Sequence, residues 1–84
     1  MAKTKVEQII TMMEQVENDT SIPKNVRKAV TDAKEKLKSK EGDLRTRASA
    51  AIYLLDEVSN DINMPMHART QIWTIMGALE TVKG

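Results

Sequence analysis

Residues 60–69 read NDINMPMHAR, and residues 18–27, forty-two positions earlier, read NDTSIPKNVR. Both stretches begin with Asn-Asp, carry Pro at the sixth position and end on Arg. The interval is half of the 84-residue chain, and the closing glycines Gly42 and Gly84 coincide at the same spacing, as do most apolar positions. Because helix breakers and apolar positions repeat together, we interpret the chain as a duplication of two units, residues 1–42 and 43–84.

Each unit is predicted to consist of two amphipathic helices joined by a short corner, because its apolar residues recur at intervals of three and four. Asn-Asp interrupts the first helix, since both side chains compete for backbone hydrogen bonds, and Pro suits the first turn of the second. Between the units, Gly42 is expected to adopt a left-handed cap and Asp43 to cap the third helix. The positions predicted to be buried are Val6, Ile9, Ile10, Met13 and Val16; Ile22, Val26, Val30, Ala33 and Leu37; Leu44, Ala48, Ala51, Ile52, Leu55 and Val58; and Met64, Ala68, Ile72, Ile75, Leu79 and Val82.

Four such helices with short connections predict an all-α fold, a four-helix up-and-down antiparallel bundle that forms one domain over residues 1–84. The alternative is an open solenoid, since two-helix units of this length match the period of HEAT repeats. A free-standing solenoid needs about three or more units. A closed bundle built from two HEAT-like hairpins accommodates both observations.

Composition narrows the class of protein further. Aromatic residues make up 2% of the chain, charged residues 30% with a net charge of +1, and cysteine is absent. An aliphatic core therefore suits helices, and neither a disulfide framework nor a thiolate metal site is expected. The longest apolar stretch, AAIYLL at residues 50–55, is too short to cross a membrane, and the first residues do not resemble a signal peptide. We therefore expect a soluble cytoplasmic protein.

The whole chain resembles an uncharacterised family of short archaeal helical proteins of unknown function, of the UPF series. The stretch LLDEVSNDINMPMHARTQIW at residues 54–73 carries the resemblance, and NDTSIPKNVRKAV at residues 18–30 repeats it more faintly. The resemblance implies a four-helix bundle and an archaeal, cytoplasmic source. It implies no activity, because none is established for the family, and therefore no catalytic or binding residues.

The polar residues at the two corners are predicted to be structural rather than catalytic, because they occur at equivalent places in both units. We expect each Asp to cap its corner and to meet an Arg across the unit boundary. The corner residues are Asp19, Pro23, Arg27, Asp61, Pro65 and Arg69.

No catalytic, cofactor or metal site is predicted, and the protein is expected not to be an enzyme. His67, the single histidine, lacks the partners of a zinc site and is expected to be solvated or to form a local hydrogen bond. No Glu-x-x-His motif accompanies the other carboxylates considered, so a di-iron site is not expected either. Those carboxylates are Glu14, Glu17, Asp56 and Glu57.

A basic segment, residues 24–40, holds seven basic and two acidic residues, a local charge of +5. Such a segment attracts phosphate backbones, although it contains no aromatic residue for base stacking. An alternating solvated face is the commoner meaning of this pattern. Weak binding of nucleic acid therefore stays open as an alternative function. The contacts would come from Lys24, Lys28, Lys34 and Lys38.

The clearest difference between the units lies on their last helices. The side of the fourth helix opposite its buried stripe is apolar, whereas the matching positions of the second helix are polar. Trp is enriched at interface centres, Met adapts to irregular partners, and Gly permits close approach. We therefore predict a module for protein interaction or assembly, with another protein or a second copy as partner, so that a homodimer would cover this patch. The predicted interface residues are Trp73, Met66, Met76, Gly77 and Tyr53.

Overall fold

The computed structural model describes residues 4–82, and that part of the chain contains four α-helices and no β-strand. This confirms the all-α, four-helix fold. The repeat position Gly84, which matches Gly42, lies outside the described residues. The helices are α1 (Lys5–Glu17), α2 (Lys24–Lys38), α3 (Leu44–Val58) and α4 (Met66–Glu80).

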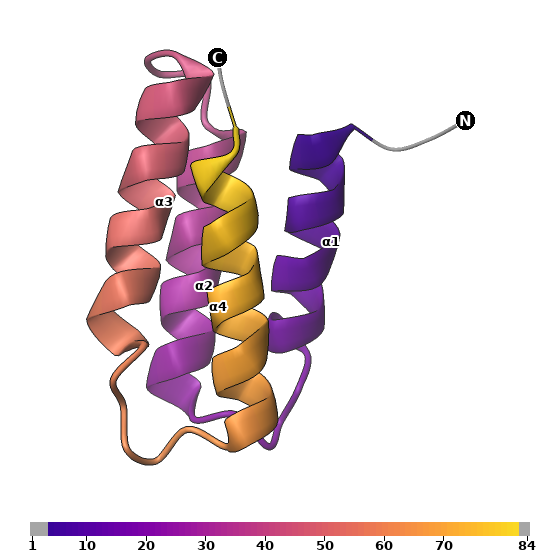
Figure 1. Cartoon of the computed structure of the whole chain (residues 1–84), viewed down its shortest axis with the longest axis vertical. Helices are drawn as coiled ribbons and strands as arrows, with labels where there is room; N and C mark the ends of the chain where they lie inside the picture. The colour runs from indigo at the N-terminus through magenta and orange to yellow at the C-terminus, as the bar shows by residue number, and fades with distance from the viewer. Residues whose placement is uncertain (1–3, 83–84) are drawn as a thin grey trace.

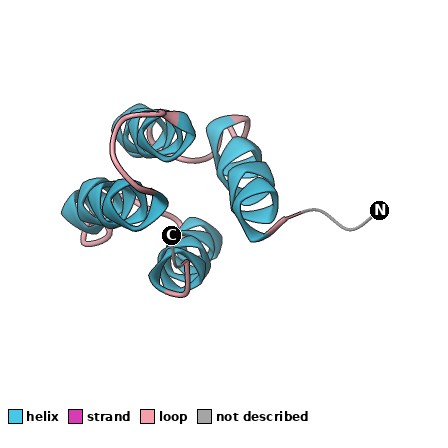
Figure 2. Ribbon diagram, turned by 90° about the horizontal axis from the view of Figure 1, so that it is seen from above, coloured by secondary structure: helices cyan, strands magenta, loops and turns pink. Residues whose placement is uncertain are grey.

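Successive helices run in opposite directions and surround a common core (Figure 1). Seen along their axes, they form a ring in which each helix contacts the helices before and after it, and α4 closes the ring against α1 (Figure 2). This is the packing of a bundle. None of the helices in residues 4–82 has the length and apolar character that crossing a membrane requires.

The core is aliphatic and follows the predicted stripes closely. Every position that was predicted to be buried on the second and fourth helices is buried in the structure. This includes three residues just outside the helix ends, Ile22, Met64 and Val82. On α1 and α3 the stripe is narrower. The positions of α1 and α3 that were predicted to be buried but remain partly exposed while packing against the core are Val6, Ile10, Leu44, Ile52 and Val58.

Capping residues explain where α1 and α3 begin. Thr4 and Glu7 form a capping box at α1, in which the Glu7 amide donates to the Thr4 hydroxyl (3.1 Å) and the Thr4 amide donates to the Glu7 carboxylate (3.0 Å). Asp43 caps α3 by accepting a hydrogen bond from the Thr46 amide (2.8 Å), as expected. Gly42 has a φ of +76°, which confirms the left-handed residue between the units.

The two units do not meet equally closely along both of their shared sides. The contact between α2 and α3 is the most extensive in the bundle, and its counterpart between α4 and α1 is the least. Thr31 and Lys34 of α2 bond to Glu17 of α1, so Ala29, on the other flank of α2 at 100° per residue, lies towards α3. The counterpart of Ala29 on α4 is Gln71. A small side chain lets two helices approach, whereas a glutamine holds them apart. The bundle is therefore more open between α1 and α4.

Candidate functional site

Each corner aspartate is held by a residue from the other unit. The Asp19 carboxylate lies 3.0 Å from Nε2 of His67, and the Asp61 carboxylate accepts a hydrogen bond from the Asn25 side chain (2.8 Å). Asn25 and His67 are equivalent positions of the repeat, as are Asp19 and Asp61. The two hydrogen bonds therefore occupy equivalent positions of the repeat, one from each unit to the other. Together they join the two corners at one end of the bundle.

Each aspartate also caps its own corner, as predicted. The Ser21 amide donates to Asp19 (2.9 Å) and the Asn63 amide donates to Asp61 (2.8 Å). Hydrogen bonds from Ser21 and then His67 hold the pKa of Asp19 below its ordinary value. Those from Asn25 and then the Asn63 amide do the same for the pKa of Asp61.

The prediction that each corner Asp meets an Arg across the unit boundary is wrong. Arg27 donates through Nε to the carbonyl of Ile22 (3.0 Å), and Arg69 donates to the carbonyl of Asp61 (3.1 Å). Both guanidinium groups therefore tie down carbonyl groups of their own corner. Those carbonyls lie where the chain is not helical, and a buried carbonyl without a donor is costly.

His67 is half-exposed, but its hydrogen bonds are not local, because its partners lie in the other unit. Its contacts with Ser21 and Asp19 do not form a nucleophilic triad. In such a triad the serine and the carboxylate meet opposite nitrogens of the imidazole ring. Here Nε2 faces both the Asp19 carboxylate and the Ser21 hydroxyl (3.2 Å), and that hydroxyl donates to Asp19 (2.6 Å).

Part of the basic segment is engaged within the protein. Lys34 is largely buried and pairs with Glu17 at 2.7 Å, and Thr31 donates to the same carboxylate. Burial raises the pKa of Glu17, but the hydrogen bonds from Lys34 and Thr31 outweigh it, so that the pKa lies below its ordinary value. The hydrogen bond to Glu17 raises the pKa of Lys34. Lys28 pairs with Asp32 at 3.4 Å in an exposed setting.

Of the lysines proposed for nucleic acid, Lys24 and Lys38 are therefore exposed without an ion pair among the described residues. Within residues 4–82, no three His, Cys, Asp or Glu side chains come close enough together to hold a metal ion.

Unit two carries all four of the large apolar side chains that are exposed in the described part of the chain. The exposed fraction is 68% for Tyr53, 90% for Ile62, 72% for Met66 and 56% for Trp73. Their counterparts in unit one are all polar. These counterparts are Thr11, Thr20, Lys24 and Thr31.

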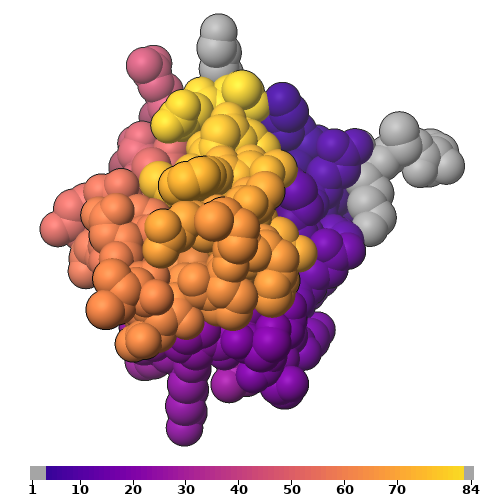
Figure 3. Space-filling model, turned by 60° about the horizontal axis from the view of Figure 1, so that its bottom comes forward, coloured from indigo at the N-terminus to yellow at the C-terminus, as the bar shows by residue number. Residues whose placement is uncertain are grey.

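We call these four residues, together with the exposed Gly77, the outer face of unit two. Figure 3 shows α4 and the loop before it forming one side of the molecule. Met76, which was predicted to belong to this patch, is half-buried and packs against the core. Ile62 was not predicted, although its counterpart Thr20 would have revealed the same change from polar to apolar.

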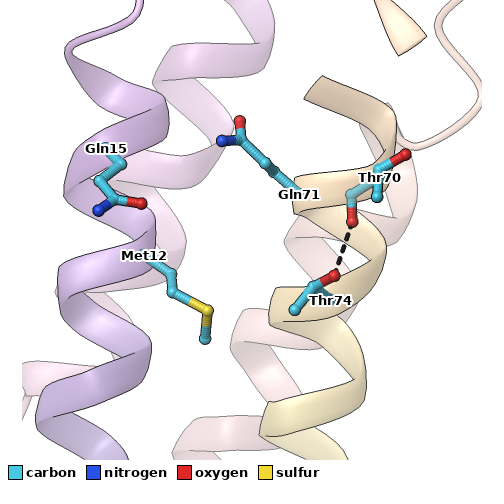
Figure 4. A pocket seen from close by; sticks show the side chains of 5 residues that line it. All are labelled: Met12, Gln15, Thr70, Gln71 and Thr74. Atoms are coloured by element: carbon cyan, nitrogen blue, oxygen red, sulfur yellow. Dashed lines mark hydrogen bonds between the residues drawn. The ribbon is translucent and has the colours of Figure 1, made fainter. Parts of the chain in front are cut away.

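A groove lies between α1 and α4, where the bundle is most open. It has a volume of about 120 Å³ and is lined by Met12 and Gln15 from α1 and by Thr70, Gln71 and Thr74 from α4 (Figure 4). Thr70 and Thr74 donate their hydroxyl hydrogens to carbonyls of α4 itself. The Gln71 side chain extends from α4 towards α1, and its buried Oε1 accepts no hydrogen bond from the described residues.

Comparison with known proteins identifies the family. Residues 1–82 match the model of the uncharacterised protein family UPF0147. A UPF0147 protein of Pyrococcus horikoshii is 49% identical over 80 residues, which are 94% of this chain and 86% of that protein. One from Sulfurisphaera tokodaii is 44% identical over 81 residues, or 96% and 91% of the two chains.

Two crystal structures share the fold. The unknown-function protein MMP1188 has a TM-score of 0.92 and 43% identity, and the match covers 99% of this chain and 100% of that one. A protein from Thermoplasma acidophilum, also of family UPF0147, has a TM-score of 0.88 and 34% identity over 94% and 93% of the two chains. The resemblance seen in the sequence is confirmed, and the chain belongs to the uncharacterised protein family UPF0147.

Proposed function

We propose that the protein is a small, non-enzymatic interaction module of the cytoplasm that binds another protein chain through the outer face of unit two. The observation that carries this proposal is the difference between equivalent surface positions of the two units. Four positions that are polar in unit one are large, apolar and exposed in unit two. Large apolar side chains that are exposed in one unit only favour a binding surface on that unit.

The two units share a fold, so the needs of folding alone would favour similar surfaces on both. At the corners they do stay alike, because Asp19 and Asp61 make equivalent hydrogen bonds. Trp73, which stands in place of Thr31, is not one of the buried core residues, because 56% of its surface is exposed. The substitutions are therefore explained better by a partner than by internal packing.

A photo-crosslinking amino acid tests this proposal at two equivalent sites. Met66 and Lys24 are the first residues of α4 and α2, and both are exposed, so the reactive group disturbs neither helix. In extract of the source cells we expect a protein adduct from position 66 and none from position 24. Equal labelling of both positions, or no adduct from position 66, would contradict the proposal.

Weak binding of nucleic acid through residues 24–40 is the second candidate, supported by the exposed Lys24 and Lys38. It has less support, because Lys34 is held by Glu17 and Lys28 by Asp32. If it holds, affinity for RNA or DNA falls steeply between 50 and 200 mM salt, as expected when phosphate contacts release counterions. Binding that does not respond to salt excludes this candidate.

A further inference from the structure

Gly77 lies within α4 although the fold gives no reason for a glycine there. Its φ is not positive, and a Cβ built on it would meet nothing within 4 Å. Glycine is a poor helix former, and its counterpart in unit one is Glu35, a good one. A glycine on an open helix surface suits the close approach of another backbone.

The groove between α1 and α4 has a defined chemical preference. Its wall is largely apolar, and the hydroxyls of Thr70 and Thr74 at its edge already donate to carbonyls of α4. The Oε1 atom of Gln71 is buried, so a group that enters the groove meets apolar surface rather than this acceptor. A flat aromatic ring suits such a wall, because it buries a large apolar area.

Trp73 offers such a ring on the same helix. With 3.6 residues per turn, Met66, Thr70 and Gly77 follow the outermost line of α4, opposite its buried stripe. Trp73 stands on the α3 side of this line, since its counterpart Thr31 bonds to Glu17 on the preceding helix. The groove, with Thr70 and Thr74 at its edge, opens on the α1 side at the same height along α4.

We propose that the partner on the outer face of unit two is a second copy of the chain, bound so that each copy places Trp73 in the α1–α4 groove of the other. This inference rests on the proposed function and names its partner. In the dimer the indole ring covers the apolar wall of the partner's groove, and the two α4 helices approach at Gly77. Both halves of the contact lie on one surface, as a two-fold symmetric interface requires.

The direction of the two-fold axis follows from the positions of Trp73 and the groove, which lie on opposite sides of α4. An axis running along the helices sets two α4 helices side by side in the same direction, so that the α3 side of one faces the α1 side of the other. Trp73 then meets the groove at its own height. An antiparallel pair would bring Trp73 against Trp73 and would leave both grooves unfilled.

The charges on α4 permit this contact. Between Met66 and Ala78 the helix carries only one side chain that is always charged, Arg69, and it is partly buried and directed at the Asp61 carbonyl. The net charge of the whole chain is +1, so repulsion between copies is small. A stable interface usually covers about 800 Å² on each partner, which is more than a single helix face offers. The contact must therefore extend over the groove to α1, as the insertion of Trp73 does.

Cysteine crosslinking tests the arrangement against a clean background, because the chain has no cysteine of its own. In the proposed dimer, residues on the outermost line face their own copies, so Thr70→Cys and Gly77→Cys should each form a disulfide-linked dimer under mild oxidation. An antiparallel pair allows this only near its crossing point, because the two positions lie about 10 Å apart along the helix. Glu35→Cys, the unit-one counterpart of Gly77, is the matched control and should remain monomeric.

Sedimentation of the native protein and two variants tests the contact itself. We expect a dimer whose dissociation constant rises about 100-fold in Trp73→Thr and about tenfold in Met66→Lys, each of which restores the unit-one residue on the contact face. The emission of Trp73, the only tryptophan, should shift to shorter wavelength as the native protein dimerises. Circular dichroism of both variants confirms that they remain folded.

A native protein that stays monomeric at every concentration would overturn the inference, and so would a dimer that neither substitution weakens. Crosslinking of Glu35→Cys as readily as Gly77→Cys would also overturn it. None of these results touches the proposed function, which fails if position 66 gives no protein adduct or if positions 66 and 24 are labelled equally. A monomer with an adduct at position 66 would separate the two, since the partner is then a different protein.

Discussion

Replacing Gly77 with alanine should stabilise the folded monomer by about 0.8–1.0 kcal/mol, the difference in helix propensity between the two residues. The full difference is expected because nothing in the structure opposes the new methyl group. Gly77 has no left-handed φ, and its added Cβ meets no atom within 4 Å. For a domain of this size, the gain corresponds to a rise in melting temperature of about 4–8 °C.

Gly42→Ala is the matched control, with the opposite sign. Its added Cβ would also be in ordinary contact only, with Thr46 at 3.9 Å, but its φ of +76° is a conformation that alanine disfavours. The substitution should therefore destabilise the protein by about 1–2 kcal/mol. Because space is available at both positions, the difference between the two variants isolates the backbone conformation.

Urea unfolding followed by circular dichroism, at a protein concentration low enough to keep the monomer, measures both variants. A Gly77→Ala protein that is no more stable than the native one would refute the reasoning, since it would mean that α4 already packs tightly at this position.

Three further substitutions address separate features of the structure. Gln71→Leu should stabilise the monomer by about 1 kcal/mol, because it removes a buried acceptor without a donor while keeping an apolar side chain of similar size; a loss of stability in urea unfolding would show that the amide is satisfied. The Glu17 carboxylate has a lowered pKa in the folded state, so its contribution is present above the ordinary value of 4.5 and is lost as the pH falls through the folded pKa. Glu17→Gln should therefore lower stability at pH 7 and flatten its decline in acid, as measured by urea midpoints from pH 7 to 2; an unchanged acid slope would contradict the pairing with Lys34. Leu55→Ala should cost about 2–5 kcal/mol, since Leu55 is fully buried, whereas Ile62→Ala, at a residue 90% exposed, should change the unfolding free energy little.

Much of the fold could be predicted from the sequence because the helical spacing of apolar residues and the 42-residue repeat agree. The spacing of apolar residues fixes which side of each helix is buried, and the repeat of Asn-Asp and Pro fixes where helices end. Pro23 and Pro65 immediately precede α2 and α4, as expected for residues that suit a helix start but not its interior. The capping box of Thr4 and Glu7 could also have been read from the sequence, since Thr-x-x-Glu precedes the first apolar stripe.

The partners of the corner residues could not be predicted in the same way. Charge alone favours a pairing of Asp with Arg, but the arginines satisfy backbone carbonyls that the sequence does not show to be buried. The bonds from Asn25 and His67 to the aspartates depend on how the two units face each other, which no local pattern encodes. Gln71 was missed because a lone glutamine among polar neighbours looks solvated until α1 is placed beside it.

Three differences between the units lie on or beside the outer side of α4, and each is unfavourable for an isolated monomer. Gln71 in place of Ala29 leaves an acceptor without a donor, and Trp73 in place of Thr31 exposes an indole ring. Gly77 in place of Glu35 weakens the helix without relieving any contact. In unit one, where the same fold is built, all three positions hold ordinary residues for a helix. Folding therefore does not require the three substitutions, but a contact that covers the ring and approaches the glycine accounts for Trp73 and Gly77 together.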